Sequence, residues 1–138
     1  MDTVTLREIL SPQSTLDELW SFNFNTSMQF LRNHIGSTDE NRVKVRVIHG
    51  HWRQEDEMRK MMEAGIWGSN VKLISAYLPD TFGSHHSKIL VLFRTNGTAQ
   101  VVVHTGISST IICKLISANM IPFDHEYGTF RFCADLGT

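Results

Sequence analysis

The stretch from Tyr77 to Thr105, YLPDTFGSHHSKILVLFRTNGTAQVVVHT, decides how this chain folds and where its chemistry lies. Its apolar run Ile89–Phe93 is short, rich in branched and aromatic residues, and bounded by an Asn-Gly signal. These features predict a buried strand that ends in a turn. A second apolar run, Val101–Val103, follows and ends at His104. We therefore expect core strands here, with polar side chains at their ends.

His86 and Lys88 stand directly before the first of these runs. Residues two apart in a strand point to the same face, so this spacing predicts that both side chains project into one space. The lysine ammonium is a compact donor for an anionic oxygen. An imidazole titrates near pH 6.5, so its neutral form can attack phosphorus or accept a proton. The pair therefore indicates a phosphodiester site, while an ordinary strand-end histidine beside a solvated lysine is the other interpretation.

Composition predicts a single globular domain. The chain has 138 residues, of which 41% are hydrophobic and 20% charged. A net charge of −1 gives no overall basic field of the kind that marks a free-standing DNA binder, although it allows a local basic groove. Cys113 and Cys133 have neither a metal-ligand spacing nor a disulfide pattern, which favours a reducing compartment. We see no secretory signal, membrane-spanning run or nuclear localisation cluster in the sequence.

Upstream of Tyr77, strands and helices are expected to alternate, which predicts an α/β fold with a mixed, partly parallel sheet and flanking helices. In the helix expected at Gln54–Ala64, Met58, Met61 and Met62 form an apolar side that we expect to fill the core. In chain order we expect a helical turn at Leu6–Pro12, a strand at Leu19–Phe24, a helix at Met28–Ile35 ended by Gly36, a strand at Val43–Ile48, a helix at Gln54–Ala64 ended by Gly65, and a strand at Val71–Ala76.

The segments PDTFGSHHSKILVLF and VVVHT together resemble the first catalytic motif of the tyrosyl-DNA phosphodiesterase family, which belongs to the phospholipase D superfamily. The upstream segments LREILSP, SFNF, VIHG and AYLP are similar to that family as well. The resemblance covers most of residues 5–105 and implies part of one phospholipase D-like half-domain.

The resemblance also divides the chain into segments. Residues 1–105 are expected to form a partial N-terminal half-domain, and 118–124 a further family-like fragment. Residues 106–117 are then a non-family insertion, and 125–138 a non-native tail. We interpret this interruption as a retained intron followed by a frameshift or a premature stop in the translated sequence.

By resemblance, His86 is the nucleophile that attacks the phosphorus of a DNA 3′-phosphodiester and forms a covalent phosphohistidine. Lys88 and Asn119 would bind the non-bridging oxygens and stabilise the charge of the transition state. Phe82 would stack on DNA bases, or else anchor a turn in the core. Gly83 would permit the close approach or turn conformation that this loop needs. The resemblance implies no cofactor and no metal.

The implied partner is a DNA 3′ end that carries a tyrosine or a topoisomerase I peptide, in the nucleus, with no role for a membrane. The family works as a monomer and uses two His-x-Lys motifs, but this sequence contains only one. The chain is therefore expected to be inactive by itself, and its uncovered apolar surface to favour self-association.

Two alternatives remain at this stage. The chain is a non-catalytic fragment that binds DNA ends, or it is a zinc-dependent hydrolase that uses His49 and His51. The sequence also departs from the family pattern at Phe24. This residue aligns with an active-site tyrosine of some family members and lacks its hydroxyl group.

Overall fold

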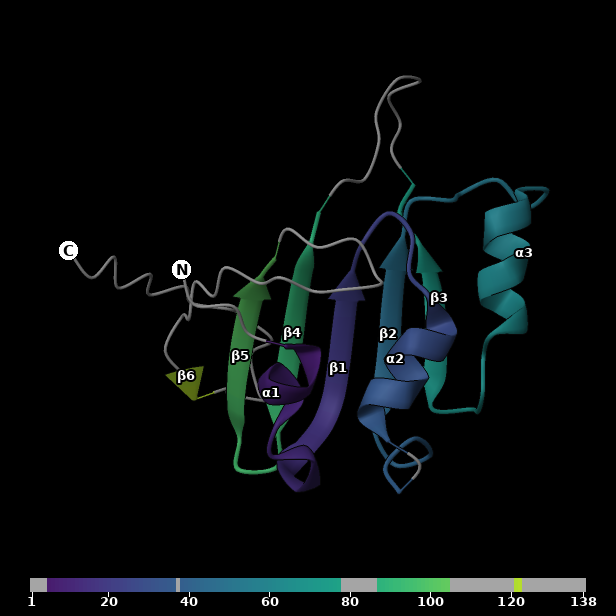
Figure 1. The fold of residues 1–138 in the computed structure, drawn as a ribbon. Helices are drawn as coiled ribbons and strands as arrows, with labels where there is room; N and C mark the ends of the chain where they lie inside the picture. Colours follow the sequence, from purple (N-terminus) through teal and green to yellow (C-terminus); the bar gives the residue numbers. More distant parts are fainter. Residues whose placement is uncertain (1–4, 37, 78–86, 105–120, 123–138) are drawn as a thin grey trace.

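The computed structural model describes residues 5–36, 38–77, 87–104 and 121–122. In this part of the chain a six-stranded sheet has the order β3-β2-β1-β4-β5-β6 (Figure 1). Strands β1, β2 and β3 are parallel, whereas β4, β5 and β6 join by antiparallel pairing. The elements are α1 (Leu6–Leu10), the 3₁₀ turn η1 (Gln13–Thr15), β1 (Leu16–Phe22), α2 (Met28–Ile35), β2 (Lys44–His49), α3 (Glu57–Ala64), β3 (Val71–Ser75), β4 (Ile89–Arg94), β5 (Thr98–Val103) and β6 (Ile121–Pro122).

Each helix begins at a polar side chain that satisfies free backbone N–H groups of its first turn. Thr5 and Glu8 form a capping box on α1, and the Ser27 hydroxyl accepts from the Phe30 N–H of α2. The carboxylate of Asp56 accepts from two N–H groups at the start of α3. These caps explain why helices this short form where they do.

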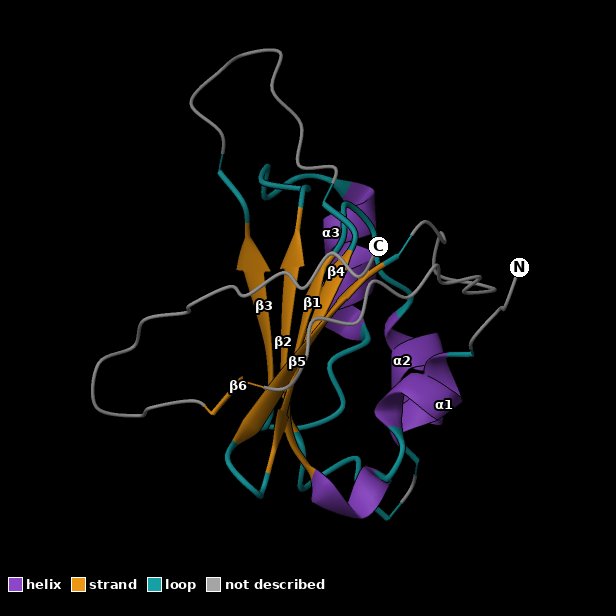
Figure 2. Cartoon of the chain, turned by 90° about the vertical axis from the view of Figure 1, so that its left-hand side faces the viewer, coloured by secondary structure: helices purple, strands orange, loops and turns teal. Residues whose placement is uncertain are grey.

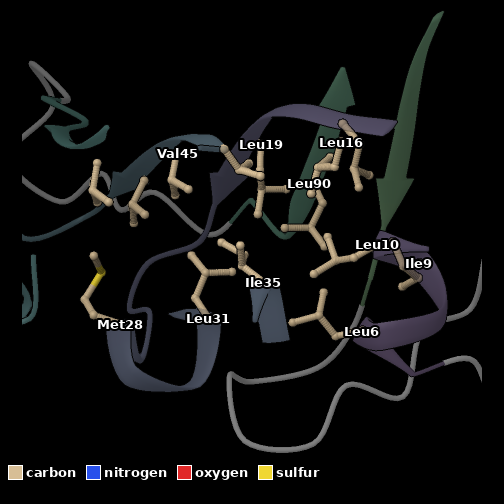
Figure 3. Close-up of a cluster of buried hydrophobic side chains, with 14 of the residues drawn as sticks. Leu6, Ile9, Leu10, Leu16, Leu19, Met28, Leu31, Ile35, Val45 and Leu90 are labelled. Atoms are coloured by element: carbon tan, nitrogen blue, oxygen red, sulfur yellow. The ribbon is translucent and has the colours of Figure 1, made fainter. Parts of the chain in front are cut away.

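Helices α1 and α2 lie on one face of the sheet (Figure 2). Their apolar side chains point at the sheet and pack against residues of β1, β2 and β4 (Figure 3). Burial of these side chains is the main favourable contribution to folding. The buried cluster comprises Leu6, Ile9, Leu10, Leu16, Leu19, Met28, Leu31, Ile35, Val43, Val45, Val47, Met62, Val71, Leu90, Leu92 and Val102.

Arg94, at the end of β4, ties α1 to the sheet. Its side chain is only 8% exposed. The guanidinium donates hydrogen bonds to the backbone carbonyl oxygens of four consecutive residues around the end of α1. These acceptors are Ile9 at 3.0 Å, Leu10 at 2.9 Å, Ser11 at 3.1 Å and Pro12 at 3.0 Å.

The predicted α/β fold with a mixed, partly parallel sheet is confirmed. Strand β1 begins at Leu16 and β5 at Thr98, each three residues earlier than predicted. Helix α3 begins at Glu57 rather than Gln54, because the Asp56 side chain caps it. The turn η1 and the two-residue β6 were not predicted.

The prediction that the methionines of α3 fill the core is wrong for two of the three. Met62 is buried, but Met58 is 37% and Met61 66% exposed. The helix therefore turns only one narrow side toward its neighbours. The end of this helix lies close to Met28 of α2. A Cβ added at Gly65 would stand 2.6 Å from the Cβ of Met28, so only glycine fits there without a shift. Among the described residues, no helix is long and apolar enough to cross a membrane.

Candidate functional site

A row of polar side chains crosses the sheet at the end where β1, β2 and β3 finish and β4 begins. Strand β1 pairs with β2 on one side and with β4 on the other. Continuing that register one residue beyond Phe22 places Asn23 between His49 and Lys88. The same alignment adds one residue from β3 and one that follows β5. We call this set the polar rim row: Ser75, His49, Asn23, Lys88 and His104.

The polar rim row lies on the face of the sheet that carries the apolar core. Residues two apart in a strand share a face, so Lys88 shares that of the buried Leu90, and Asn23 that of the buried Leu19. His49 is 1% exposed and His104 5%, whereas Lys88 is half-buried. Lys88 therefore lies in a largely buried polar row that borders the core at the end of the sheet where β4 begins, and a basic side chain there can meet an anion.

The backbone fixes Lys88 at this position. Its carbonyl oxygen accepts a hydrogen bond of 2.9 Å from the N–H of His104. This bond extends the pairing of β4 with β5 one step past the last strand residues. The backbone of Lys88 is therefore held by the sheet and does not belong to a free loop.

A second polar cluster lies beside the row, where β2 leads into α3. The Nδ1 of His49 accepts from the backbone N–H of His51 at 3.2 Å. The Nδ1 of His51 is 2.9 Å from the Oδ2 of Asp56, and this hydrogen bond lowers the pKa of the Asp56 carboxyl group. Burial, and then the positive charge of Arg59, lower the pKa of His49. His49 is therefore a neutral buried imidazole at neutral pH.

The zinc-hydrolase alternative finds no support in this geometry. In the ranges that the structure describes, no group of three or more His, Cys, Asp or Glu side chains is placed to hold a metal ion. The two histidines and Asp56 instead connect the end of β2 to the first turn of α3.

Of the predicted site residues, the structure describes Lys88. The predicted positions of His86, Asn119, Phe82 and Gly83 lie outside the described residues, so their roles stay predictions. Phe24, at the tyrosine-like position, packs on the ring of His51, with 4.5 Å between the ring centroids. It lies one residue beyond the polar rim row.

The sequence reasoning missed three members of the row, Ser75, Asn23 and His104, of which the last two flank Lys88. Alternation along SFNF already places Asn23 on the face of Ser21, and VVVHT places His104 at a strand end. The missing information was the register between strands, which brings them beside Lys88.

The sequence of the chain matches the family described as tyrosyl-DNA phosphodiesterase over residues 1–129. That range includes 106–117, and the prediction that this segment is an insertion stays a prediction. A curated relative, a probable tyrosyl-DNA phosphodiesterase of Schizosaccharomyces pombe, is 36% identical over 96 residues. The match covers 69% of this chain and 17% of the relative, so the chain spans less than a fifth of that protein.

Solved structures show the same fold. The crystal structure of yeast tyrosyl-DNA phosphodiesterase aligns with a TM-score of 0.52 at 23% identity, over 76% of this chain and 25% of the yeast chain. A histidine-to-alanine variant of the yeast protein aligns with a TM-score of 0.55 at 20% identity, over 83% of this chain and 26% of the other. On the family match and the fold together, the chain belongs to the tyrosyl-DNA phosphodiesterase family.

Proposed function

We propose that this chain carries the first catalytic motif of a tyrosyl-DNA phosphodiesterase, within part of the N-terminal half-domain, and binds the 3′-phosphodiester end of DNA at the polar rim row. The observation that carries the proposal is the position of Lys88, held by the sheet in a polar row at the rim and flanked by Asn23 and His104. A lysine in such a place offers three N–H donors to an anionic oxygen.

In the proposed reaction, a neutral nitrogen of His86 attacks the phosphorus. A P–N bond forms, the P–O bond to the tyrosine breaks, and the phenolate leaves with the bonding electron pair. Lys88 and Asn119 bind the non-bridging oxygens, where negative charge grows in the transition state. Hydrolysis of the phosphohistidine by water then releases the DNA 3′-phosphate and restores the imidazole.

This sequence holds one His-x-Lys motif, and the proposed reaction needs a second acid–base group. Without it the phenolate must leave unprotonated, and general acid catalysis typically contributes about 10²–10⁴-fold. The chain by itself is therefore proposed to bind DNA ends with little or no turnover. The proposed partner is a DNA 3′ end carrying a tyrosyl or topoisomerase I peptide adduct, and the proposed location is the nucleus. Self-association through exposed apolar side chains is part of the same proposal.

The test compares single-stranded oligonucleotides that carry phosphotyrosine at the 3′ or the 5′ end, with binding and tyrosine release measured separately. We expect preferential binding of the 3′ adduct and little release. The Lys88→Ala variant should bind the 3′ adduct about tenfold more weakly or worse, since a hydrogen bond from a charged donor is worth about 1.5–3 kcal/mol.

The matched control is Lys72→Ala, which removes an exposed lysine from β3 of the same sheet. It should leave binding of the 3′ adduct unchanged. Equal binding of both adducts, or equal losses in the two lysine variants, would refute the proposed site. Rapid tyrosine release by the unmodified chain would instead refute the proposed lack of turnover.

A further inference from the structure

Two large aromatic side chains stand exposed beside each other on the loops that follow β2 and β3. Trp52 is 47% and Tyr77 68% exposed. Their rings meet edge to face with 5.8 Å between centroids, and the guanidinium of Arg53 lies 5.2 Å from the Trp52 ring centroid. Aromatic side chains of this size usually find partners within the protein, so the pair is costly to leave in water.

The backbone beneath this pair is held on several sides. The Arg59 side chain donates to the carbonyl oxygen of Trp52 at 2.8 Å, and the Asp56 N–H donates to that of Arg53 at 3.3 Å. Below Tyr77, the Ala76 N–H donates to the carbonyl oxygen of His49 at 2.8 Å. The backbone beneath the exposed rings is therefore held by hydrogen bonds, which lowers the entropy cost of ordering this part of the chain when something stacks on the rings.

The aromatic pair shares its end of the sheet with the polar rim row. Trp52 is three residues past His49, and Tyr77 is two residues past Ser75. Strands β2 and β3 lie two and three strand positions from β4. At about 4.8 Å per strand, the pair is about 10–14 Å across the sheet from Lys88. The two to three residues past the row lengthen this separation to at most about 16 Å, which at about 3.4 Å per nucleotide of a stacked strand corresponds to about three to five nucleotides.

We propose that Trp52 and Tyr77, with Arg53, form a stacking platform for unpaired bases of the DNA strand whose 3′ end lies at Lys88. This inference rests on the proposed function and adds a second contact with the same substrate. Aromatic faces bind any base, and a nearby guanidinium adds attraction to the phosphates. The exposed Glu55 lies two residues past Arg53, and Glu57 is paired with Lys60 at 2.9 Å, so this segment has no net positive charge beyond Arg53 and base stacking carries the binding more than charge does.

The test uses the full chain and a short single-stranded DNA that ends in a 3′-phosphate and carries the fluorescent base 2-aminopurine four nucleotides from that end. Trp52→Ala and Tyr77→Ala should each weaken binding about fivefold or more and relieve the stacking quench of the probe. Trp52→Phe should retain most of the binding. The dependence of affinity on salt should stay unchanged, because no phosphate contact is lost. The control Met61→Ala removes a side chain that is 66% exposed and should have no effect.

Unchanged affinity and quenching in both alanine variants would overturn the platform. The same titrations with a 3′-hydroxyl strand separate the two proposals. Loss of the preference for the 3′-phosphate in Lys88→Ala tests the end-binding site, whereas the aromatic variants should weaken binding of both strands equally. If the unmodified chain binds neither strand, both proposals fail.

Discussion

The ring of Phe24 lies directly against the backbone of Gly50. A Cβ added at Gly50 would stand 2.2 Å from the Cδ2 and 2.6 Å from the Cε2 of that ring. The N–H of Gly50 also donates to the carbonyl oxygen of Phe24 at 3.0 Å, so the two segments cannot easily separate. The glycine therefore lets the loops after β1 and β2 meet beside the polar rim row.

Gly50→Ala should lower the free energy of unfolding by about 1–3 kcal/mol, because the added methyl group overfills this contact. Urea denaturation measures the loss. In a double-mutant cycle, Gly50→Ala should lower the free energy of unfolding much less when Phe24→Ala is also present, since the ring that the methyl group meets is gone. Additive effects of the two substitutions would contradict this contact.

Arg94→Met should destabilise the fold by about 3 kcal/mol or more, because the buried carbonyl oxygens at the end of α1 lose their donor. Arg94→Lys should recover only part of the loss, since an ammonium cannot span these acceptors as the planar guanidinium does. Arg7→Ala is the control, because it removes an exposed arginine of α1. Its effect on urea denaturation should stay within about 0.5 kcal/mol.

Stability should depend on pH through His49. Burial and then Arg59 hold the pKa of His49 below its ordinary value of 6.5 in the folded protein, so the unfolded chain takes up the proton first as pH falls. The free energy of unfolding should therefore decrease as pH falls below about 6.5, by at most about 1.4 kcal/mol per pH unit. Above that pH this group should contribute no slope.

Denaturation between about pH 7.5 and pH 5.5 measures this slope. His49→Gln should flatten it, because glutamine does not titrate. Asp56, which contacts His51, also makes stability decrease as pH falls. The pKa of its carboxyl group lies below the ordinary 3.8, so this effect begins at a lower pH than that of His49. Parallel curves for the two proteins would show that the slope comes from other groups.

Asn23→Asp should weaken binding of a DNA 3′-phosphate by about tenfold. Neighbouring side chains on paired strands are about 5 Å apart at Cβ, so the new carboxylate would neutralise Lys88 and repel the phosphate. Fluorescence anisotropy with a 3′-phosphate strand gives the affinity.

Asn96→Asp makes the same substitution in the β4–β5 turn, at the opposite end of the sheet. The Asn96 oxygen accepts from the N–H and hydroxyl of Thr98, and a carboxylate can accept the same bonds. This variant should bind DNA as the unmodified chain does. If it weakens binding as much as Asn23→Asp, the cause is overall charge and not the polar rim row.

The order and type of the main elements could be predicted from the sequence because they depend on local patterns. Apolar and polar residues alternate from Val43 to Ile48, which indicates β2. Met28, Leu31 and Ile35 recur at helical spacing, and they form the buried side of α2. The start of β1 was missed because Leu16 follows a 3₁₀ turn whose polar residues carry no strand signal.

The candidate site was harder to predict because it depends on which strands are neighbours. The sequence identified Lys88, since it directly precedes an apolar run. Asn23 lies sixty-five residues earlier and becomes its neighbour only because β4 pairs antiparallel with β1. The exposure of Met61 was also hidden, because helical spacing says which residues share a side but not whether another element covers it.

The order β3-β2-β1-β4-β5-β6 has a consequence for synthesis on the ribosome. Strand β1, one of the two central strands, is the first to emerge, and β2 and β3 can join it through local crossovers while its other edge stays unpaired. That edge is covered only after Arg94 has left the exit tunnel. A translational pause shortly before β4 would therefore leave a partly folded intermediate with an unpaired strand edge, which is prone to aggregation and needs protection by chaperones.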